Sequence, residues 1–149
     1  MIDSVSEGAV TQFRPFEGIW LATVPSGAVA CAKVFNGKLL IPYSFGGEGK
    51  LTGHYFDCRV IGGTLYSRFE QFDSARSGVL LLTVGSNETL KGGRWMNEQV
   101  SEAVRQDISS LSESLPKMQR TVWIRVLKAE TPEWAEKYFR EDWPNKPSV

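Results

Sequence analysis

The sequence predicts an all-β protein: an eight-stranded antiparallel meander barrel with a helical insertion before the last strand and a short C-terminal helix. Short runs of β-branched and aromatic residues recur at regular spacing, and turns rich in Gly and Pro separate them. Eight consecutive strands are enough to close a small barrel, whose interior is filled by side chains or holds one small ligand. Closure also removes the exposed sheet edges.

The first three expected strands cover residues 19–24, 29–35 and 38–44. Asn36-Gly37 joins the second to the third, and this dipeptide is the strongest short hairpin signal. In the resulting register Val34 faces Leu39 and Ala30 faces Tyr43, so one face of this hairpin is apolar.

A second hairpin is expected from residues 54–61 and 64–71, joined by Gly62-Gly63. Both glycines tolerate positive φ, which favours a primed two-residue turn. That turn places Phe56 opposite Phe69 on an apolar, inward face, together with Cys58. It places Asp57 opposite Arg68 on a charged outer face, as stable cross-strand pairs require.

The remaining expected strands cover residues 79–84, 89–96 and 121–128. Between the last two, helical spacing predicts an insertion over residues 98–115, from its apolar residues Val100, Val104, Ile108, Leu111 and Leu115. Thr131 as N-cap and Pro132 as the first helical residue indicate a helix over residues 131–142. Residues 1–149 then form one domain with its barrel over 16–128 and flexible tails at 1–8 and 144–149.

Composition excludes several classes of function. The 149 residues contain 17 Lys and Arg against 17 Asp and Glu, so the net charge is zero. A balanced chain argues against nucleic-acid binding and against electrostatic attachment to a membrane. The first residues lack a basic region and an apolar core, and no apolar run approaches the roughly 20 residues of a membrane span. With only two cysteines, we expect a cytoplasmic protein with reduced thiols.

The sequence offers little to a catalyst. His54 is the only histidine, and the hairpin register places it near the barrel rim as a structural or solvent-facing residue. Cys31 and Cys58 lack the spacing of a zinc site and are expected to be small core residues. The glycine-rich stretch 46–52 fails the phosphate-loop pattern, because Leu51 stands where Ser or Thr must bind magnesium. We therefore expect no catalytic residue, metal site or cofactor.

Three segments carry a family resemblance. Gly18-Ile19-Trp20 at the first strand, Leu51–Tyr55 and Leu90–Trp95 resemble the Gly-plus-aromatic strands of calycins, the lipocalin- and avidin-like barrels. The resemblance implies a structural role for Trp20 and Arg125, in which the guanidinium stacks on the indole. Residues 36–69 also resemble small bacterial regulators of type III secretion that have a lipocalin-like barrel and bind a transcriptional activator.

Two functions follow as hypotheses. The first is non-enzymatic binding of a small, largely apolar ligand inside the barrel, walled by Tyr43, Phe56, Phe69 and Trp95. If the second hairpin is inverted, its polar face, including Tyr66 and Arg68, lines the interior and grips a charged ligand. The alternative function is a protein-interaction or regulatory module that uses the amphipathic helices or the charged hairpin face. An enzyme is the least supported of the three classes.

Overall fold

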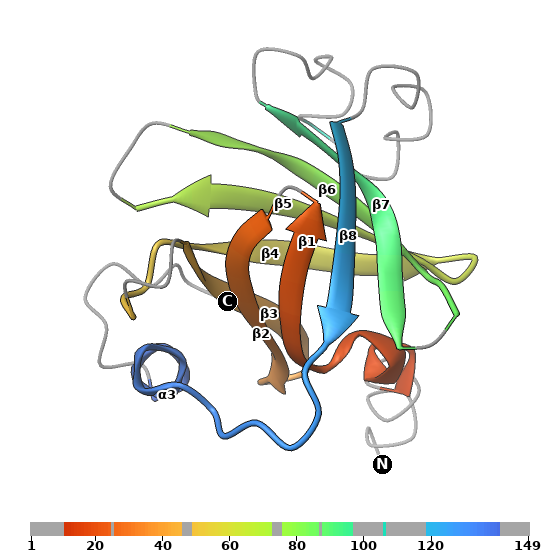
Figure 1. Ribbon diagram of the computed structural model, residues 1–149. Coiled ribbons are helices and arrows are strands. Elements are labelled where there is room, and N and C mark those ends of the chain that lie inside the picture. Colours follow the sequence, from red (N-terminus) through yellow and green to blue (C-terminus); the bar gives the residue numbers. More distant parts are fainter. Residues whose placement is uncertain are drawn as a thin grey trace.

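The computed structural model describes residues 11–24, 26–45, 49–72, 76–86, 88–96, 106 and 119–140. Eight antiparallel strands in sequence order form a closed barrel, because the last strand pairs with the first (Figure 1). The 3-10 helix η1 (Arg14–Phe16) precedes strands β1 (Gly18–Val24), β2 (Ser26–Phe35), β3 (Lys38–Phe45), β4 (Gly53–Ile61), β5 (Thr64–Gln71), β6 (Ser77–Val84), β7 (Thr89–Met96) and β8 (Gln119–Arg125). The predicted all-β meander is confirmed, whereas the insertion predicted over residues 98–115 lies, Gln106 apart, outside the described residues.

Helix α3 (Glu133–Phe139) lies against the outside of the barrel (Figure 1). It is shorter than the predicted 131–142, and its N-cap is Pro132 rather than Thr131. The Pro132 carbonyl accepts the backbone N–H groups of Ala135 and Glu136, so the backbone itself caps this helix. In the described part of the chain, no helix has the length and apolar character needed to cross a bilayer.

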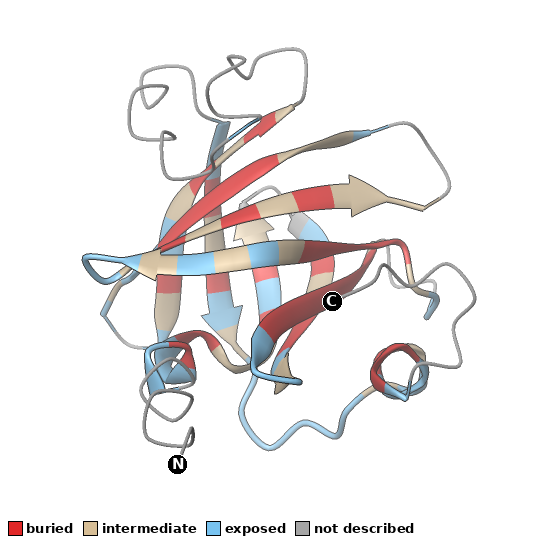
Figure 2. Ribbon diagram, turned by 180° about the vertical axis from the view of Figure 1, so that it is seen from behind, coloured by how far each residue is buried: buried red, intermediate tan, exposed pale blue. Residues whose placement is uncertain are grey.

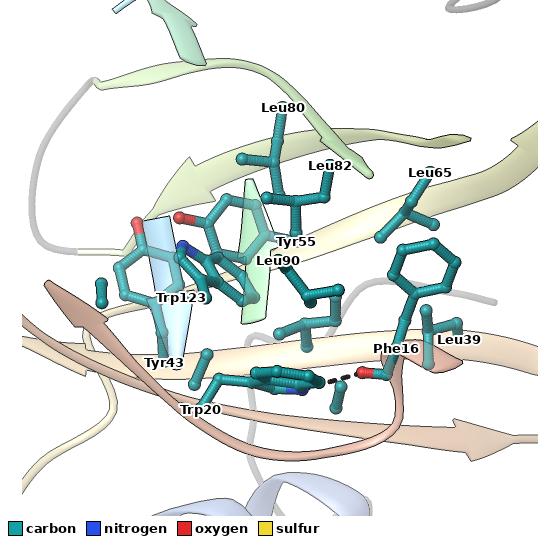
Figure 3. Packing of buried hydrophobic residues seen from close by; sticks show 14 of the residues in the cluster. Phe16, Trp20, Leu39, Tyr43, Tyr55, Leu65, Leu80, Leu82, Leu90 and Trp123 are labelled. Carbon is teal, nitrogen blue, oxygen red and sulfur yellow. Dashed lines mark hydrogen bonds between the residues drawn. The ribbon is translucent and has the colours of Figure 1, made fainter. Parts of the chain in front are cut away.

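One continuous cluster of buried side chains lies inside the barrel (Figure 3). Every strand contributes to it through alternate residues, as an eight-stranded barrel requires. Its large members are Phe16, Trp20, Leu39, Ile41, Tyr43, Tyr55, Leu65, Phe69, Leu80, Leu82, Leu90 and Trp123. The predicted pairs Val34–Leu39 and Ala30–Tyr43 are confirmed in the β2–β3 register.

Two further clusters lie on the outer face of the barrel. Beneath α3, Cys31 and Leu40 pack with Ala135, Tyr138 and Phe139. On the neighbouring strands the second outer cluster contains Val79, Leu81 and Trp95, with Tyr66 packed against it. Strand β6 is therefore buried on both faces over residues 79–82, as its unbroken apolar run predicts (Figure 2).

A bulge in β4 changes the register of the second hairpin. Next to the turn the pairs are the predicted ones, with Val60 opposite Leu65. Between Phe56 and Arg59 the register shifts, so that Tyr55 pairs with Phe69. The prediction that Phe56 lies opposite Phe69 is therefore wrong.

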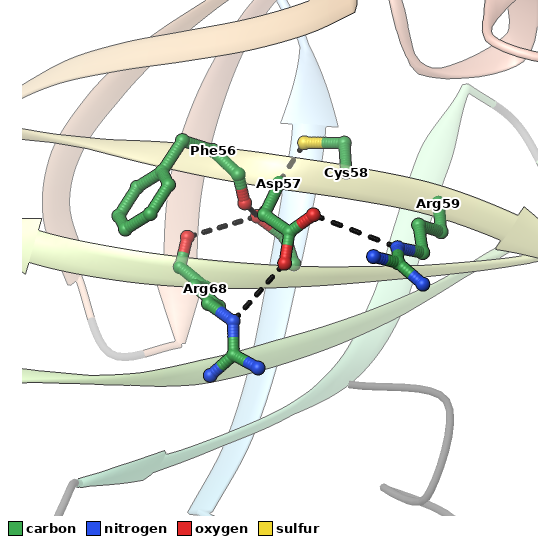
Figure 4. Close-up of polar contacts among 6 residues, drawn as sticks. Phe56, Asp57, Cys58, Arg59 and Arg68 are labelled. Carbon is green, nitrogen blue, oxygen red and sulfur yellow. Dashed lines mark hydrogen bonds and ion pairs between the residues drawn. The ribbon is translucent and has the colours of Figure 1, made fainter. Parts of the chain in front are cut away.

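The cause of the shift is the backbone at Asp57, which adopts φ of 51°. Aspartate is among the few non-glycine residues that tolerate the left-handed region, and one such residue is enough for a bulge. Its carboxylate lies between Arg68 at 3.0 Å and Arg59 at 3.5 Å (Figure 4). The predicted contact between Asp57 and Arg68 is present, although their strand register differs from the predicted one.

The barrel end that carries η1 is here called the Arg125 end. Trp20 donates its indole N–H to the Phe16 carbonyl at 2.9 Å (Figure 3), and the Arg125 guanidinium lies 4.3 Å from the Trp20 ring centroid. Arg125 also donates to the Glu88 carboxylate and to the Glu17 carbonyl. A Cβ at Gly18, whose φ is 125°, would collide with the Arg125 guanidinium. Both residues of the Gly-x-Trp spacing, Gly18 and Trp20, therefore pack against the Arg125 guanidinium.

Candidate functional site

The opposite end of the barrel, here called the Arg94 end, has an aromatic inner wall. Tyr55 is its centre, with ring centroids 5.0 Å from Tyr43, 5.7 Å from Phe69 and 5.4 Å from Trp123. Because β4 and β8 are not neighbours, the contact between Tyr55 and Trp123 crosses the barrel (Figure 3). These rings pack the middle of the interior, as tilted and edge-on aromatic pairs do.

Three small residues complete this wall. Ala22, Ala28 and Ala30 are buried on β1 and β2, and Ala30 pairs with Tyr43. Ala22 pairs with Trp123 across the β1–β8 seam. At the Arg94 end, the alanine methyl groups on β1 and β2 therefore lie between the rings of Trp123 on β8 and Tyr43 on β3.

Arg94 is the charged member of the inner wall. On β7 it occupies the same face as Leu90, which belongs to the interior cluster, and it pairs with Leu80. Its guanidinium carbon lies 5.4 Å from the centroid of Phe69, a cation–π contact. The side chain is half-buried, and its Nε atom is buried without a hydrogen-bond partner.

Tyr55 is the polar neighbour of Arg94. Burial raises the pKa of the Tyr55 phenol, and the Arg94 guanidinium opposes this shift by its charge and by a side-chain hydrogen bond. A phenol with a raised pKa keeps its proton at neutral pH. The pair thus combines a fixed cation with a neutral hydroxyl inside an aromatic wall.

The predicted ligand residues separate into two groups. Tyr43 and Phe69 lie in the interior, 1% and 2% exposed. The other four lie on the outer face, because the bulge turns Phe56 outward and because alternation along β5 and β7 directs the rest outward. These outward residues are Phe56, Tyr66, Arg68 and Trp95.

Sequence reasoning missed Tyr55 and Arg94. Tyr55 was hidden by the bulge, since an unbroken hairpin places it outside. The inward face of β7 could not be assigned from its neighbour β6, because the continuous apolar run of β6 does not indicate which residues face inward. The alternation along β7 itself indicates the inward face, because Leu90 and Met96 lie on the same face as Arg94 and both pack in the interior cluster.

His54 is part of a hydrogen-bonded chain outside the barrel. It is fully buried, so of the two expected alternatives the structural residue is confirmed and the solvent-facing residue is wrong. Nδ1 lies 2.6 Å from the Tyr138 hydroxyl, and Nε2 lies 2.9 Å from a Glu70 carboxylate oxygen. Burial also raises the pKa of the Tyr138 phenol. Because Tyr138 belongs to α3, this chain of polar contacts holds the helix on the barrel.

A pocket of about 270 Å³ opens beside α3. Lys50 and Leu51 form one side, and Trp134, Lys137 and Tyr138 form the other. It lies outside the barrel, and none of the predicted ligand residues lines it. Its volume falls just below the range of roughly 300–1,000 Å³ that is usual for small-molecule sites.

Both thiols are free and packed in apolar surroundings, as the sequence predicts. Desolvation raises the pKa of Cys31 to about 11 and that of Cys58 to about 12. Neither is therefore activated as a nucleophile. The described residues include no group of three or more His, Cys, Asp or Glu side chains arranged to hold a metal ion.

Comparison with protein-family models, with curated proteins and with solved structures gave no match to this chain. The protein is therefore classified from its fold and its site alone. The protein is a closed, eight-stranded antiparallel β-barrel whose interior carries a half-buried arginine among aromatic rings.

Proposed function

We propose that this protein is a non-enzymatic, calycin-like binding protein that takes a small, largely apolar ligand at the Arg94 end of its barrel. The observation that carries the proposal is the wall around Tyr55, in which aromatic rings and alanine methyl groups surround two convergent polar groups. Binding sites for small molecules have this composition, mostly apolar with a few polar groups that fix orientation.

The position of the ligand follows from the ring contacts. Tyr55 closes the middle of the barrel by touching Trp123. A ligand would therefore enter from the Arg94 end and pack over Tyr55, beside Ala22 and Ala28. The small side chains are essential to this arrangement, because any larger residue there would occupy the space that the ligand needs.

The chemistry-bearing side chains support a binding role over a catalytic one. His54 lies outside the barrel and is engaged by Tyr138 and Glu70. The raised pKa values of Cys31 and Cys58 disfavour the thiolates that a nucleophile needs. Two free thiols, Cys31 buried and Cys58 half-buried, also fit a protein of a reducing compartment, and we propose the cytosol.

The proposal is tested with octan-1-ol, a neutral apolar probe, by NMR titration of the ¹⁵N-labelled protein. We expect saturable shifts at Tyr43, Phe69 and the Trp123 indole. Ala28→Leu should weaken this binding roughly tenfold by filling the space, whereas Val29→Leu, whose side chain points outward from the same strand, should not. Shifts confined to outer residues, or none that saturate, would overturn the proposal.

A protein-interaction module is the second candidate function. The apolar side of α3 is already packed on the barrel, because Ala135 and Tyr138 are fully buried. The observation that favours this candidate lies elsewhere, on the outer face of β1 and β8. There Leu21 and Ile124 form an exposed cross-strand pair, 41% and 42% exposed.

Sedimentation velocity of the wild type and of Ile124→Lys tests this second candidate. A concentration-dependent assembly of the wild-type chain that the lysine abolishes would favour it. A monomer at all concentrations, together with octan-1-ol binding inside the barrel, would leave the ligand-binding proposal as the better supported function.

A further inference from the structure

Arg94 differs from the ion-paired arginines of the described chain, because it has no carboxylate partner there. Arg125 is paired with Glu88, and Arg68 with Asp57. Among the described residues, Arg94 lies over the Phe69 ring and acts on the Tyr55 phenol by its charge. It forms no ion pair there, and its Nε atom is buried and unpaired.

Such an arrangement is costly as long as no anion pairs with the guanidinium. A guanidinium withdrawn from water loses hydration, and an aromatic ring returns only part of that loss. Replacement of a buried charge by an apolar residue of similar size is often neutral or stabilising. A half-buried cation whose Nε atom is unpaired therefore points to an anionic binding partner.

We infer that Arg94 and Tyr55 bind the carboxylate of an anionic ligand, so that the ligand is a small aliphatic or aromatic carboxylic acid. This inference rests on the proposed function and adds the charge of the ligand to it. The guanidinium provides a planar fork of N–H donors that matches a carboxylate. The Tyr55 hydroxyl is protonated and can donate its hydrogen to the same carboxylate.

The charge balance favours a monoanion. One guanidinium neutralises one carboxylate, and the neighbouring groups of the wall, Tyr43, Phe69 and Trp123, carry no charge. A phosphate dianion would leave unpaired negative charge against these rings, whose faces are themselves negative. The apolar part of the ligand would then pack over Tyr55, as the proposed function requires.

A matched pair of probes separates the charge from the apolar body. Octanoate and octan-1-ol have the same chain length and differ in the head group. We expect the wild-type protein to bind octanoate about tenfold more tightly than octan-1-ol at pH 7.5, because hydrogen bonds to a charged group are the stronger ones. NMR titration measures both affinities and reports which residues shift.

Two arginine variants test whether Arg94 causes the preference for octanoate over octan-1-ol. Arg94→Met keeps the length and apolar stem of the side chain but removes the charge, and it should bring the two affinities to within about twofold. Arg120→Met is the control, since Arg120 lies at the same end of the barrel on β8 with an exposed side chain. This control should retain the wild-type preference. Tyr55→Phe should lower the affinity for octanoate and leave that for octan-1-ol unchanged.

Each outcome decides one of the two proposals. Equal affinity of the wild type for both probes, or a preference that survives in Arg94→Met, overturns the inference and leaves the proposed function standing. Failure of both probes to bind inside the barrel overturns the proposed function itself. A well-dispersed NMR spectrum of Arg94→Met shows that a lost preference reflects the missing charge rather than an unfolded chain.

Discussion

The two ends of the barrel each place an arginine over an aromatic ring, and the surroundings of the two arginines differ. At the Arg125 end the guanidinium lies 4.3 Å from the Trp20 centroid and also donates to Glu88 and to the Glu17 carbonyl. At the Arg94 end the guanidinium lies 5.4 Å from the Phe69 centroid, and its charge opposes the rise in the pKa of the buried Tyr55 phenol. Arg125 is paired with a carboxylate of its own chain, whereas among the described residues Arg94 has no carboxylate partner.

The difference distinguishes a structural role from a binding role. A charge that is paired within the protein contributes to stability, so its removal costs stability. An unpaired charge lowers stability, and natural proteins retain such groups where function requires them. The comparison therefore predicts opposite consequences for the same substitution at the two ends.

The largest effect is expected at the centre of the Arg125 end. Trp20 is 1% exposed and holds Phe16 through its indole N–H. Trp20→Ala should lower the free energy of unfolding by about 3–5 kcal/mol, because it leaves a cavity and removes the surface on which Arg125 rests. Urea unfolding measures the loss.

Leu21→Ala is the control for this substitution. Leu21 follows directly in the chain, and its side chain is 41% exposed on the outer face. Its truncation should cost less than about 1 kcal/mol. Similar losses for the two variants would show that the Arg125 end is not the rigid unit described above.

The direct test of the comparison is one substitution made at both ends. Arg125→Met should destabilise the protein by about 2 kcal/mol, because it removes a cation–π contact and hydrogen bonds to a carboxylate and a carbonyl. Arg94→Met should change the free energy of unfolding by less than about 1 kcal/mol or increase it. Urea unfolding at one pH and salt concentration suffices for both. A larger loss at Arg94 than at Arg125 would reverse the assignment of roles.

The smallest effect concerns the half-buried thiol of Cys58. Burial raises the pKa of Cys58 from 9.0 to about 12. The folded state therefore holds the thiol proton more tightly than the unfolded state, and this contribution, complete below pH 9, is lost as the pH rises toward 12. Between pH 8 and pH 10 it should account for about 1 kcal/mol of the free energy of unfolding.

Urea unfolding of the wild type and of Cys58→Ala at these two pH values isolates that contribution. The wild type should lose more stability between pH 8 and pH 10 than the variant, in which Cys31 and the tyrosines still titrate. An identical pH dependence of the two proteins would mean that water reaches Cys58 in the folded state.

Local chemistry accounts for the part of the fold that was predictable. Asn36-Gly37 and Gly62-Gly63 specify tight turns through their own backbone preferences. All four of these residues have positive φ in the structure. The pairs next to each turn follow directly, as Val34 with Leu39 and Val60 with Leu65 do. The stacking of Arg125 on Trp20 was anticipated from the family resemblance.

The candidate site was predictable only in part. Tyr43 and Phe69 lie where their hairpins place them, whereas Phe56 and Trp95 lie on the opposite face. An error of one residue in register moves a side chain to the other side of a strand. Turn chemistry loses its influence with distance from the turn, so residues beyond a bulge cannot be assigned to a face from the hairpin alone.

The sequence by itself determined the strand order, the two hairpin turns and the presence of a C-terminal helix, because each depends on interactions between residues close in the chain. Only the tertiary structure decided that Asp57 forms a bulge, that His54 is buried beneath α3 and that Arg94 faces inward. These features depend on what packs on both faces of a strand at once. In β4 the interior accommodates Tyr55 and α3 covers Phe56, and no local pattern contains both neighbours.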